Sequence, residues 1–370
     1  MLGFRGGHQG PDPARGPEPV SSRPHSLIGS TTLESVLSQT YKRIEAIVVD
    51  DGSSDATSTI IEEFVKRDSR VQLVWQSNAG VGAARNTAIG KARGKYIAPL
   101  DADDFWFPEK LEKQVACMEQ YGIETGLVYC WSTLIDEHGD FLSNGLPQTV
   151  EGRLRHALIL RNVVGCASVP LFRASALEQV GLYLTRAEQA GAQGCEDWDL
   201  SLRIAEIFSI RVVPESLVAY RQTRSSMSVR TEEMAASFAV TMGRARQRNS
   251  DLPAATFRWS AGNFYVYLVG RCMRWGHYAR CFRFLKEAVR ADPVLLLSTN
   301  VYRALLKSLL KLIMRPSGNR PAEPVRPRPK KTGEQAGLNS EKGRRFPFIS
   351  NRLFEQIELE RWSGALKDGG

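Results

Sequence analysis

Between residues 31 and 131, short apolar runs alternate with segments of helical periodicity, and this alternation constrains the fold more than any other feature of the sequence. Continuous apolar runs of the kind that form buried strands occupy residues 44–49, 71–75, 96–100 and 126–131. The intervals between them carry apolar residues at helical spacing, which predicts amphipathic helices. Strands that alternate with helices predict an α/β fold, with a mostly parallel sheet that helices cover on both faces.

After residue 131 the alternation becomes less regular. Short strands are expected near 168–172 and 210–213, and from about residue 232 the chain has the pattern of successive helices. The predicted organisation is a segment without regular structure at 1–26, an α/β domain at 27–230, a helical region at 231–314, a basic proline-rich linker at 315–347 and a tail with room for a short helix at 348–370.

Acidic residues follow two of the predicted strands at the point where each strand ends. These residues are Asp50, Asp51, Asp101, Asp103 and Asp104. Because ligands of an open parallel sheet bind at the carboxyl ends of its strands, we expect both acidic clusters at one edge of the sheet. Carboxylates that converge there repel each other unless a cation lies between them, and hard oxygen ligands favour Mg²⁺ or Mn²⁺ held together with substrate phosphates.

Each acidic cluster also has a purely structural interpretation, which the residues alone leave open. The segment 50–53 fits a strand-to-helix turn with an Asp or Ser N-cap, and 101–104 fits a solvated turn before the helix that Pro108 opens. The second interpretation is the weaker one, because three acids directly after an apolar run are costly without a counterion. An EF-hand is excluded, since Phe105 stands where an oxygen ligand is needed.

Five ordered motifs resemble those of the family 2 glycosyltransferases, over about residues 27–230. In chain order they are SVLSQTY at 35–41, IVVDDGS at 47–53, AARN at 83–86, DAD at 101–103 and EDWDL at 196–200. The resemblance implies a GT-A fold, inversion at the anomeric carbon and a divalent cation, Mn²⁺ or Mg²⁺. It also implies a nucleotide-sugar donor, carrying UDP, GDP or dTDP, and a role in the biosynthesis of a cell-surface polysaccharide.

Carried over position by position, the resemblance implies roles for individual residues. Asp51 would contact the base of the nucleoside, and Arg85 would reach the base or the diphosphate. Asp101 would face the ribose or the donor sugar, while Asp103 would bind the metal. Arg224 lies in a segment where the family carries a cationic side chain that approaches the diphosphate.

The acceptor hydroxyl must lose its proton as it attacks, so a carboxylate must lie on the acceptor side as general base. Glu196 and Asp197 are the candidates, and Asp197 is preferred. A metal on Asp103 would stabilise the charge that develops on the leaving diphosphate. The alternative interpretation of the acidic pair is the first turn of a helix over 198–207, where carboxylates favour the helix dipole.

The sequence departs from the family pattern near its start. Family members open with a buried strand and a Pro-x-Tyr-Asn-like turn, whereas SSRPHSL stands at 21–27 in this chain. We therefore expect the usual first strand to be missing or replaced. The alternative to an active enzyme is a non-catalytic, degenerate relative that acts as a binding protein.

Positive charge concentrates near the C-terminus of the sequence. The chain carries a net charge of +9, and nine Lys or Arg against three Glu between residues 315 and 345 account for most of it. No nucleic-acid partner is expected, because no recognisable nucleic-acid-binding module accompanies this charge. The helix expected at 302–314 is basic and amphipathic, with Leu305, Leu309, Leu312 and Ile313 on one face. Such a helix suits contact with a membrane surface and a lipid-linked acceptor, while a free glycan is the other acceptor considered.

We expect a cytoplasmic protein, peripheral to the inner face of the membrane if the helix at 302–314 binds it. The first twenty residues lack the apolar segment of a signal peptide, and no uninterrupted apolar run reaches the length of about 18 residues that a spanning helix needs. The six cysteines show neither C-x-x-C spacing nor a disulfide framework, which fits a reducing compartment.

Overall fold

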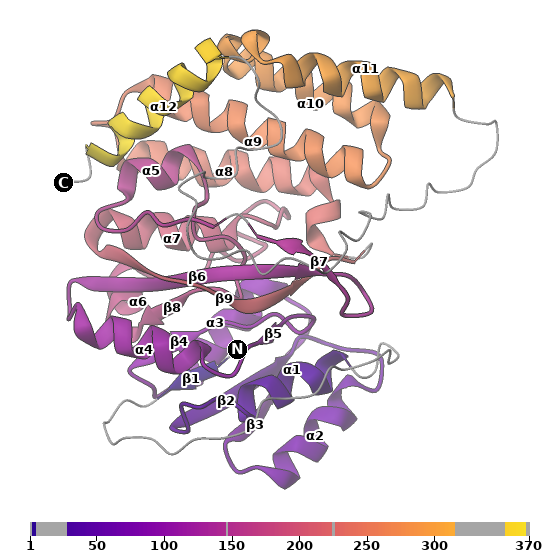
Figure 1. The fold of residues 1–370 in the computed structure, drawn as a ribbon. Coiled ribbons are helices and arrows are strands. Elements are labelled where there is room, and N and C mark those ends of the chain that lie inside the picture. The colour runs from indigo at the N-terminus through magenta and orange to yellow at the C-terminus, as the bar shows by residue number, and fades with distance from the viewer. Residues whose placement is uncertain (1, 5–27, 146, 224–225, 315–351, 368–370) are drawn as a thin grey trace, which may run out of the picture.

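The computed structural model describes residues 2–4, 28–145, 147–223, 226–314 and 352–367. Figure 1 shows a β-sheet region in the lower half of the view and a stack of helices in the upper half, with α5 and α7 between them. Within the described ranges, no helix is both long enough and apolar enough to cross a bilayer.

The sheet holds every strand of the described residues. The strands are β1 (Leu2–Phe4), β2 (Ile44–Asp50), β3 (Val71–Trp75), β4 (Tyr96–Ala98), β5 (Phe105–Trp106), β6 (Thr125–Ile135), β7 (Phe141–Asn144), β8 (Leu171–Arg173) and β9 (Ser209–Arg221). Their order is β3-β2-β1-β4-β8-β6-β9-β5, and β7 pairs with β6 off this path. The four apolar runs predicted as strands are thereby confirmed as β2, β3, β4 and β6, and the two short strands predicted further on correspond to β8 and β9.

The α/β class is confirmed, but the sheet is mixed rather than mostly parallel. β2 pairs with β3, and β6 with β9, in parallel, whereas the other pairs are antiparallel. Parallel neighbours occur where a helix carries the chain back across the sheet, as α2 does between β2 and β3. β8 lies between β4 and β6 and is antiparallel to both, which breaks the parallel order that the alternation of strands and helices suggested.

The place between β2 and β4 is filled by β1. Leu2 lies opposite Ala46 on one side and Ala98 on the other, and β1 is antiparallel to both neighbours. The expectation of no regular structure at 1–26 is therefore wrong for Leu2–Phe4, while residues 5–27 lie outside the described residues. The physical reason is that the facing N–H and C=O groups of two buried strands need hydrogen-bond partners, and a short strand of either direction supplies them.

Helices cover the sheet and form the upper part of the molecule. They are α1 (Ile28–Leu37), α2 (Thr57–Arg67), α3 (Val81–Lys91), α4 (Lys110–Gln120), α5 (Arg155–Leu160), α6 (Ala174–Val180), α7 (Glu196–Ile207), α8 (Thr231–Arg248), α9 (Ala254–Arg274), α10 (Tyr278–Ala291), α11 (Thr299–Ile313) and α12 (Arg352–Lys367), with the short 3₁₀ helices η2 (Met227–Val229) and η3 (Pro293–Leu297). The predicted C-terminal helical region is confirmed by α8 to α11.

An aromatic cluster joins the helical region to the sheet region. The rings of Phe238 in α8 and Phe264 in α9 stack with centroids 4.0 Å apart, and Trp198 of α7 lies 5.6 Å from Phe238. All three side chains are buried. Because aromatic pairs add about 0.5–1.5 kcal/mol beyond the burial of their area, this cluster holds α7 firmly against the helical region.

α12 returns to this helical region after the undescribed residues 315–351, which include the predicted basic linker. Arg361 lies 2.5 Å from Asp292 in an ion pair and stacks 4.4 Å above the ring of Trp259 in α9. Both charged side chains are largely buried, so the pair anchors α12 beside η3.

Candidate active site

The first acidic pair of the sequence separates into two different roles. Asp50, at the end of β2, is 4% exposed and accepts hydrogen bonds from the Ser53 amide and the Ser58 hydroxyl. Burial acts to raise the pKa of Asp50, but the hydrogen bonds from Ser58 and Ser53 outweigh it and lower that pKa. Asp50 therefore stabilises the turn before α2. The expected Asp or Ser N-cap is not found, because the N-cap residue of α2 is Ala56, which makes no side-chain capping hydrogen bond.

Asp51 binds the loop that leads into α3. Its carboxylate accepts hydrogen bonds from Gln76 Nε2 at 2.7 Å, from the Ala79 amide at 2.8 Å and from the Gly80 amide at 2.9 Å. Gly80 has a φ of +90°, a conformation that glycine adopts readily. The structure thus places Asp51 at the junction of β2, β3 and α3, with most of its acceptor capacity used by the protein.

Arg85 of α3 lies at the centre of the site. Its guanidinium is 2.6 Å from Asp101 Oδ1 and 3.3 Å from Glu196 Oε1, and it stands over the ring of Tyr183 at 5.2 Å. Burial alone would lower the pKa of Arg85, but the charges of Asp101, Tyr183 and Glu196 raise it. The buried Arg85 guanidinium therefore joins the carboxylates of two separate motifs, Asp101 of DAD and Glu196 of EDWDL.

Asn86, which follows Arg85 in the AARN motif, holds the backbone of Tyr183, the residue whose ring lies beside Arg85. Asn86 donates to the Tyr183 carbonyl at 2.8 Å and accepts from the Tyr183 amide at 2.9 Å. Close contact between α3 and this segment also requires Gly82, because a Cβ there would lie 2.2 Å from the Leu184 carbonyl oxygen. The small-residue helix of the sequence is thus explained by the close approach of the segment 182–184.

The acidic turn after β4 contains one structural carboxylate. Asp104 is 1% exposed and accepts from the Ser168 hydroxyl at 2.5 Å and from the Arg221 amide at 2.8 Å. Ser168 also accepts from the Asp101 amide at 3.0 Å, and Arg221 Nε donates to the Asp103 carbonyl at 2.8 Å. Both ends of the turn are thereby held by side chains from β9 and from the loop before β8.

Asp103 differs from its neighbours because its carboxylate has no hydrogen-bond partner among the described residues, although its side chain is only half-exposed. Burial and the nearby charge of Asp101 raise the pKa of Asp103 to about 6. The charge of Arg221 acts in the opposite direction but does not cancel this rise, so a bound cation would further stabilise the charged form of Asp103.

The second acidic pair begins α7. Glu196 accepts from the Gly194 amide at 2.7 Å as well as from Arg85, so both of its oxygens are engaged. Asp197 accepts only from the Trp198 amide, at 2.8 Å through Oδ1. Burial and the charge of Glu196 raise the pKa of Asp197 to about 7, while Arg85 acts in the opposite direction. Of the two acids, Asp197 is the one with a free oxygen and a pKa near neutrality.

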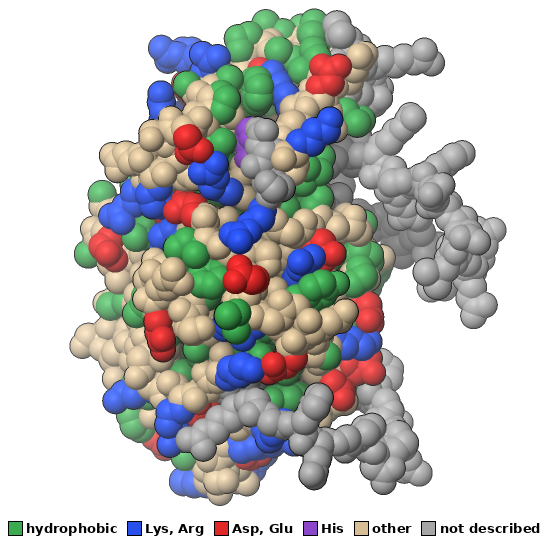
Figure 2. Space-filling view, turned by 90° about the vertical axis from the view of Figure 1, so that its left-hand side faces the viewer, with side chains coloured by type: hydrophobic (Ala, Val, Ile, Leu, Met, Phe, Trp, Pro, Cys, Tyr) green, Lys and Arg blue, Asp and Glu red, His purple; other side chains and the backbone are tan. Residues whose placement is uncertain are grey.

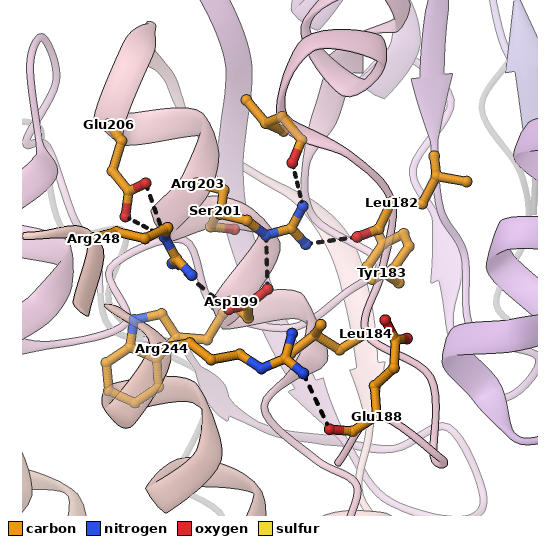
Figure 3. A network of polar contacts seen from close by, with 12 residues as sticks. Leu182, Tyr183, Leu184, Glu188, Asp199, Ser201, Arg203, Glu206, Arg244 and Arg248 are labelled. Atoms are coloured by element: carbon orange, nitrogen blue, oxygen red, sulfur yellow. Dashed lines mark hydrogen bonds and ion pairs between the residues drawn. The ribbon is translucent and has the colours of Figure 1, made fainter. Parts of the chain in front are cut away.

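A polar network behind α7 holds this acidic end in place, and Figure 3 shows it. Arg203 pairs with the fully buried Asp199 at 2.8 Å and donates to the Val180 and Leu182 carbonyls at 2.7 and 2.6 Å. Arg248 of α8 reaches Glu206 at 3.0 Å and Asp199 at 3.7 Å. The network therefore connects α7, α8 and the segment that carries Tyr183.

Two tyrosines belong to the site although no sequence motif indicated them. Tyr183 is 2% exposed, and its buried hydroxyl has no hydrogen-bond partner among the described residues. Tyr267 of α9 keeps 45% of its surface exposed, yet burial raises its pKa, and Arg271, Cys195 and Asp197 act on it electrostatically. The electrostatic interaction of Tyr267 with Asp197 shows that α9 contributes to the surroundings of Asp197. Helical periodicity alone cannot show which element a helix face will cover.

The residues proposed from the sequence fall into three groups. Arg85, Asp101 and Glu196 are in direct contact, and Asp103 and Asp197 interact electrostatically with Asp101. Asp51 is bound to its own loop, and no hydrogen bond or ion pair joins it to the other candidate residues within the described ranges. Arg224 lies outside the described residues.

No group of three or more His, Cys, Asp or Glu side chains within the described ranges is arranged as a complete metal site. The Asp103 carboxylate, which makes no hydrogen bond to another described residue, and the neighbouring Asp101 carboxylate are nevertheless the donor set expected for a cation that is shared with substrate phosphates. The residues therefore fit a substrate-bridged divalent cation and do not form a closed protein cage.

Comparisons with known proteins show similarity to glycosyltransferases. The sequence model of glycosyl transferase family 2 matches residues 30–180. The chain is 35% identical over 211 residues to EpsH of Bacillus subtilis, which is named as a glycosyltransferase, and the match covers 55% of this chain and 59% of EpsH. It is 32% identical over 200 residues to TuaG of the same organism, named as a teichuronic acid biosynthesis glycosyltransferase, and covers 53% of this chain and 75% of TuaG.

The chain thus spans 59% of the length of EpsH, which is less than two thirds, and it spans 75% of the length of TuaG. Among solved structures, Staphylococcus aureus TarS residues 1–349 in complex with UDP-GlcNAc aligns with a TM-score of 0.46 and 15% identity, over 75% of this chain and 88% of that one. A TM-score below 0.5 supports no conclusion about this chain, so the sequence similarity carries the comparison.

Proposed function

This chain belongs to glycosyl transferase family 2, and from its site geometry we propose that it transfers a sugar from a nucleotide-diphosphate donor to an acceptor hydroxyl, with inversion at the anomeric carbon. The observation that carries the proposal is the contact of Arg85 with both Asp101 and Glu196, which joins three separate motifs in one buried cluster. The polysaccharide that receives the sugar is proposed to be a cell-surface glycan or its lipid-linked precursor.

Asp197 is proposed as the general base. A base works best when its pKa is close to the working pH, and burial with the charge of Glu196 raises the pKa of Asp197 to about 7. The Trp198 amide fixes Oδ1, which leaves Oδ2 to accept the proton of the attacking hydroxyl. Glu196, with both oxygens engaged, holds Arg85 and has a positioning role.

Asp103 is proposed as the protein ligand of a divalent cation, Mn²⁺ or Mg²⁺, at the donor diphosphate. Bound there, such a cation would supply Lewis-acid stabilisation of the departing diphosphate. Arg221 holds the backbone of this turn through the Asp103 carbonyl, so the carboxylate starts from a defined position. Because the charge of Arg85 is shared by two carboxylates, we propose that Arg85 orients Asp101 toward the donor sugar.

The nucleoside is proposed to bind near Asp51, whose loop borders the start of α3, and Arg224 is proposed to approach the diphosphate. UDP, GDP and dTDP remain the candidate nucleotides. A cytoplasmic location is also proposed, and the six cysteines, all free thiols, support a reducing compartment.

A donor panel tests the proposal. UDP-, GDP- and dTDP-linked sugars are each incubated with the protein and Mn²⁺, and release of nucleoside diphosphate is measured with and without chelator. We expect release from one donor class, its loss with chelator, and a fall of about a hundredfold or more in Asp103→Asn and Asp197→Asn. The exposed Asp140→Asn is the matched control and should keep wild-type activity.

Two results would contradict parts of this proposal. Asp103→Asn with wild-type turnover would remove the assignment of the metal ligand. Absence of both release and thermal stabilisation by any nucleoside diphosphate with Mn²⁺ would favour the non-catalytic alternative. Where a product forms, its anomeric configuration by NMR decides whether the sugar is inverted.

A further inference from the structure

α11 exposes its apolar side chains and buries its small and polar ones. The outward side chains are Tyr302, Leu306, Leu309, Leu310 and Ile313, and Leu306 and Ile313 are 59% and 72% exposed. The side chains that face the protein are Asn300, Val301, Ala304 and Ser308. The helix is therefore attached through a narrow side of small residues, and its widest apolar side is largely exposed, although the Tyr302 hydroxyl donates to the Leu296 carbonyl at 2.8 Å.

The outward apolar side differs from the one predicted for this helix. Leu309 and Ile313 are exposed as that pattern requires, but Leu305 and Leu312 are half-buried, and Leu305 packs against the core. The correction follows from the position of α10, which Figure 1 shows directly beneath α11 along the upper edge of the molecule. Packing against α10 turns a different side of the helix toward solvent.

A row of cations borders the exposed apolar side. Arg303, Lys307 and Lys311 are four residues apart from one another and therefore lie in one line along the helix, and all three are exposed. Between residues 293 and 314 the sequence contains no Asp or Glu. The exposed surface of α11 is thus apolar along one line and uniformly positive along the next.

The apolar surface continues beyond α11. Leu296 and Leu297 of η3, the turn that precedes α11, are 48% and 39% exposed. Figure 2 shows hydrophobic side chains gathered at the upper end of the molecule, with both basic and acidic side chains near them. An exposed apolar patch of this kind, bordered along α11 by a row of cations, marks an interaction site.

We propose that α11 and η3 form a docking surface for an anionic lipid bilayer, with α11 lying in the plane of the interface. An apolar line beside a line of cations is the arrangement by which an amphipathic helix inserts its side chains at the level of the lipid headgroups. Three exposed cations in a segment of sequence without Asp or Glu complement phosphate headgroups, whereas the core of an interface between protein chains is depleted of lysine.

Vesicle sedimentation of the full chain tests this proposal. The vesicles contain either equal parts of phosphatidylglycerol and phosphatidylcholine or phosphatidylcholine alone. We expect binding to the anionic vesicles, a loss of about tenfold or more in Leu306→Ser/Leu310→Ser, and a loss of roughly a hundredfold in Arg303→Gln/Lys307→Gln/Lys311→Gln. Binding to phosphatidylcholine alone should be weak, since the cations then have no net charge to meet.

Matched controls separate α11 from general effects of charge and hydrophobicity. Ile123→Ser removes an apolar side chain that is 76% exposed elsewhere, and Lys42→Gln/Lys66→Gln/Lys91→Gln removes three other exposed cations. Both should bind as the wild type does. All of the substituted side chains are exposed, so the variants should fold, which circular dichroism verifies.

Wild-type binding in Leu306→Ser/Leu310→Ser would overturn the proposal, because another basic part of the chain would then account for binding. A wild-type dimer in sedimentation velocity that only the leucine variant dissociates, without any vesicle binding, would equally overturn it in favour of a second copy. The inference does not rest on catalysis: Asp103→Asn should bind vesicles as tightly as the wild type, so the two proposals can fail separately.

Discussion

Arg85 and Glu196 are 111 positions apart in the chain, and Arg85 Nη1 lies 3.3 Å from Glu196 Oε1 in the buried centre of the site. The same guanidinium is 2.6 Å from Asp101. Three segments that lie far apart in the sequence are thus joined through the Arg85 guanidinium. The first prediction therefore concerns the contribution of Arg85 to the free energy of unfolding.

Replacement of Arg85 by Met should lower the free energy of unfolding by about 3–5 kcal/mol, because it leaves Glu196 buried without its counterion. Urea unfolding followed by circular dichroism measures this change. The exposed Arg93, which reaches Glu45 at 3.4 Å, is the control, and Arg93→Met should cost less than about 1 kcal/mol. The double variant Arg85→Met/Glu196→Gln should recover part of the loss, and an Arg85→Met variant as stable as Arg93→Met would contradict this account.

The pKa of Asp197 predicts how activity depends on pH. A general base must be deprotonated, so kcat/KM should rise tenfold per pH unit below pH 7 and level off above about 7, where burial and Glu196 place this pKa. The measurement is a pH series of nucleoside diphosphate release with a saturating metal concentration. A profile that is flat between pH 5 and 8 would remove Asp197 from the role of base.

The same raised pKa has a consequence for stability. The ordinary pKa of Asp is 3.8 and the folded value for Asp197 is about 7, so between these values the folded state binds the extra proton. The free energy of unfolding should therefore fall as the pH rises from about 4 to 7. Asp197→Asn should remove part of that fall in urea unfolding curves taken across this range, whereas Asp140→Asn, at an exposed position, should leave it unchanged.

Tyr183→Phe should leave the protein as stable as the wild type or stabilise it by about 1–2 kcal/mol, because it removes a buried hydroxyl without a hydrogen-bond partner among the described residues. The ring that lies beside Arg85 is kept. Tyr129→Phe is the matched control, since that hydroxyl donates to the Val150 carbonyl at 2.6 Å and its loss should destabilise by about 1–2 kcal/mol. Thermal and urea unfolding of the two variants measure these changes. The prediction is wrong if Tyr183→Phe is less stable than Tyr129→Phe.

Lys110 is fully buried, with Nζ 2.8 Å from Gln114 Oε1 and 4.1 Å from the centre of the Trp106 ring. Burial lowers the pKa of Lys110 to about 8 from its ordinary value of 10.5. Between these values only the unfolded chain carries the proton, so this residue makes the free energy of unfolding rise with pH from about 8 to 10.5.

Lys110→Met should therefore be more stable than the wild type at pH 7, by an amount on the order of 3 kcal/mol, and the difference should shrink toward pH 10. Urea unfolding at several pH values measures it. The exposed Lys66→Met should follow the wild-type curve throughout, and a loss of stability in Lys110→Met at pH 7 would show that the buried ammonium is favourable.

Local patterns were sufficient for much of the fold. The four apolar runs became strands, and the acids that follow them lie at strand ends, because strand and helix periodicity depends only on neighbouring residues. Non-local pairing was not predictable in this way. The antiparallel insertion of β8 between β4 and β6, and the placement of β1 between β2 and β4, depend on which backbone edges remain unpaired once the chain is folded.

The amino-acid sequence by itself determined the α/β class, the acidic ends of the strands and the membership in a glycosyltransferase family, since all of these are properties of short ordered motifs. Only the tertiary structure decided which carboxylates are used by the protein and which stay free: Asp104 and Glu196 are engaged, whereas Asp103 and Asp197 keep an open oxygen. It also decided which side of α11 meets solvent. Hydrogen bonding, burial and charge pairing depend on distances between residues far apart in the chain, and folding alone sets those distances.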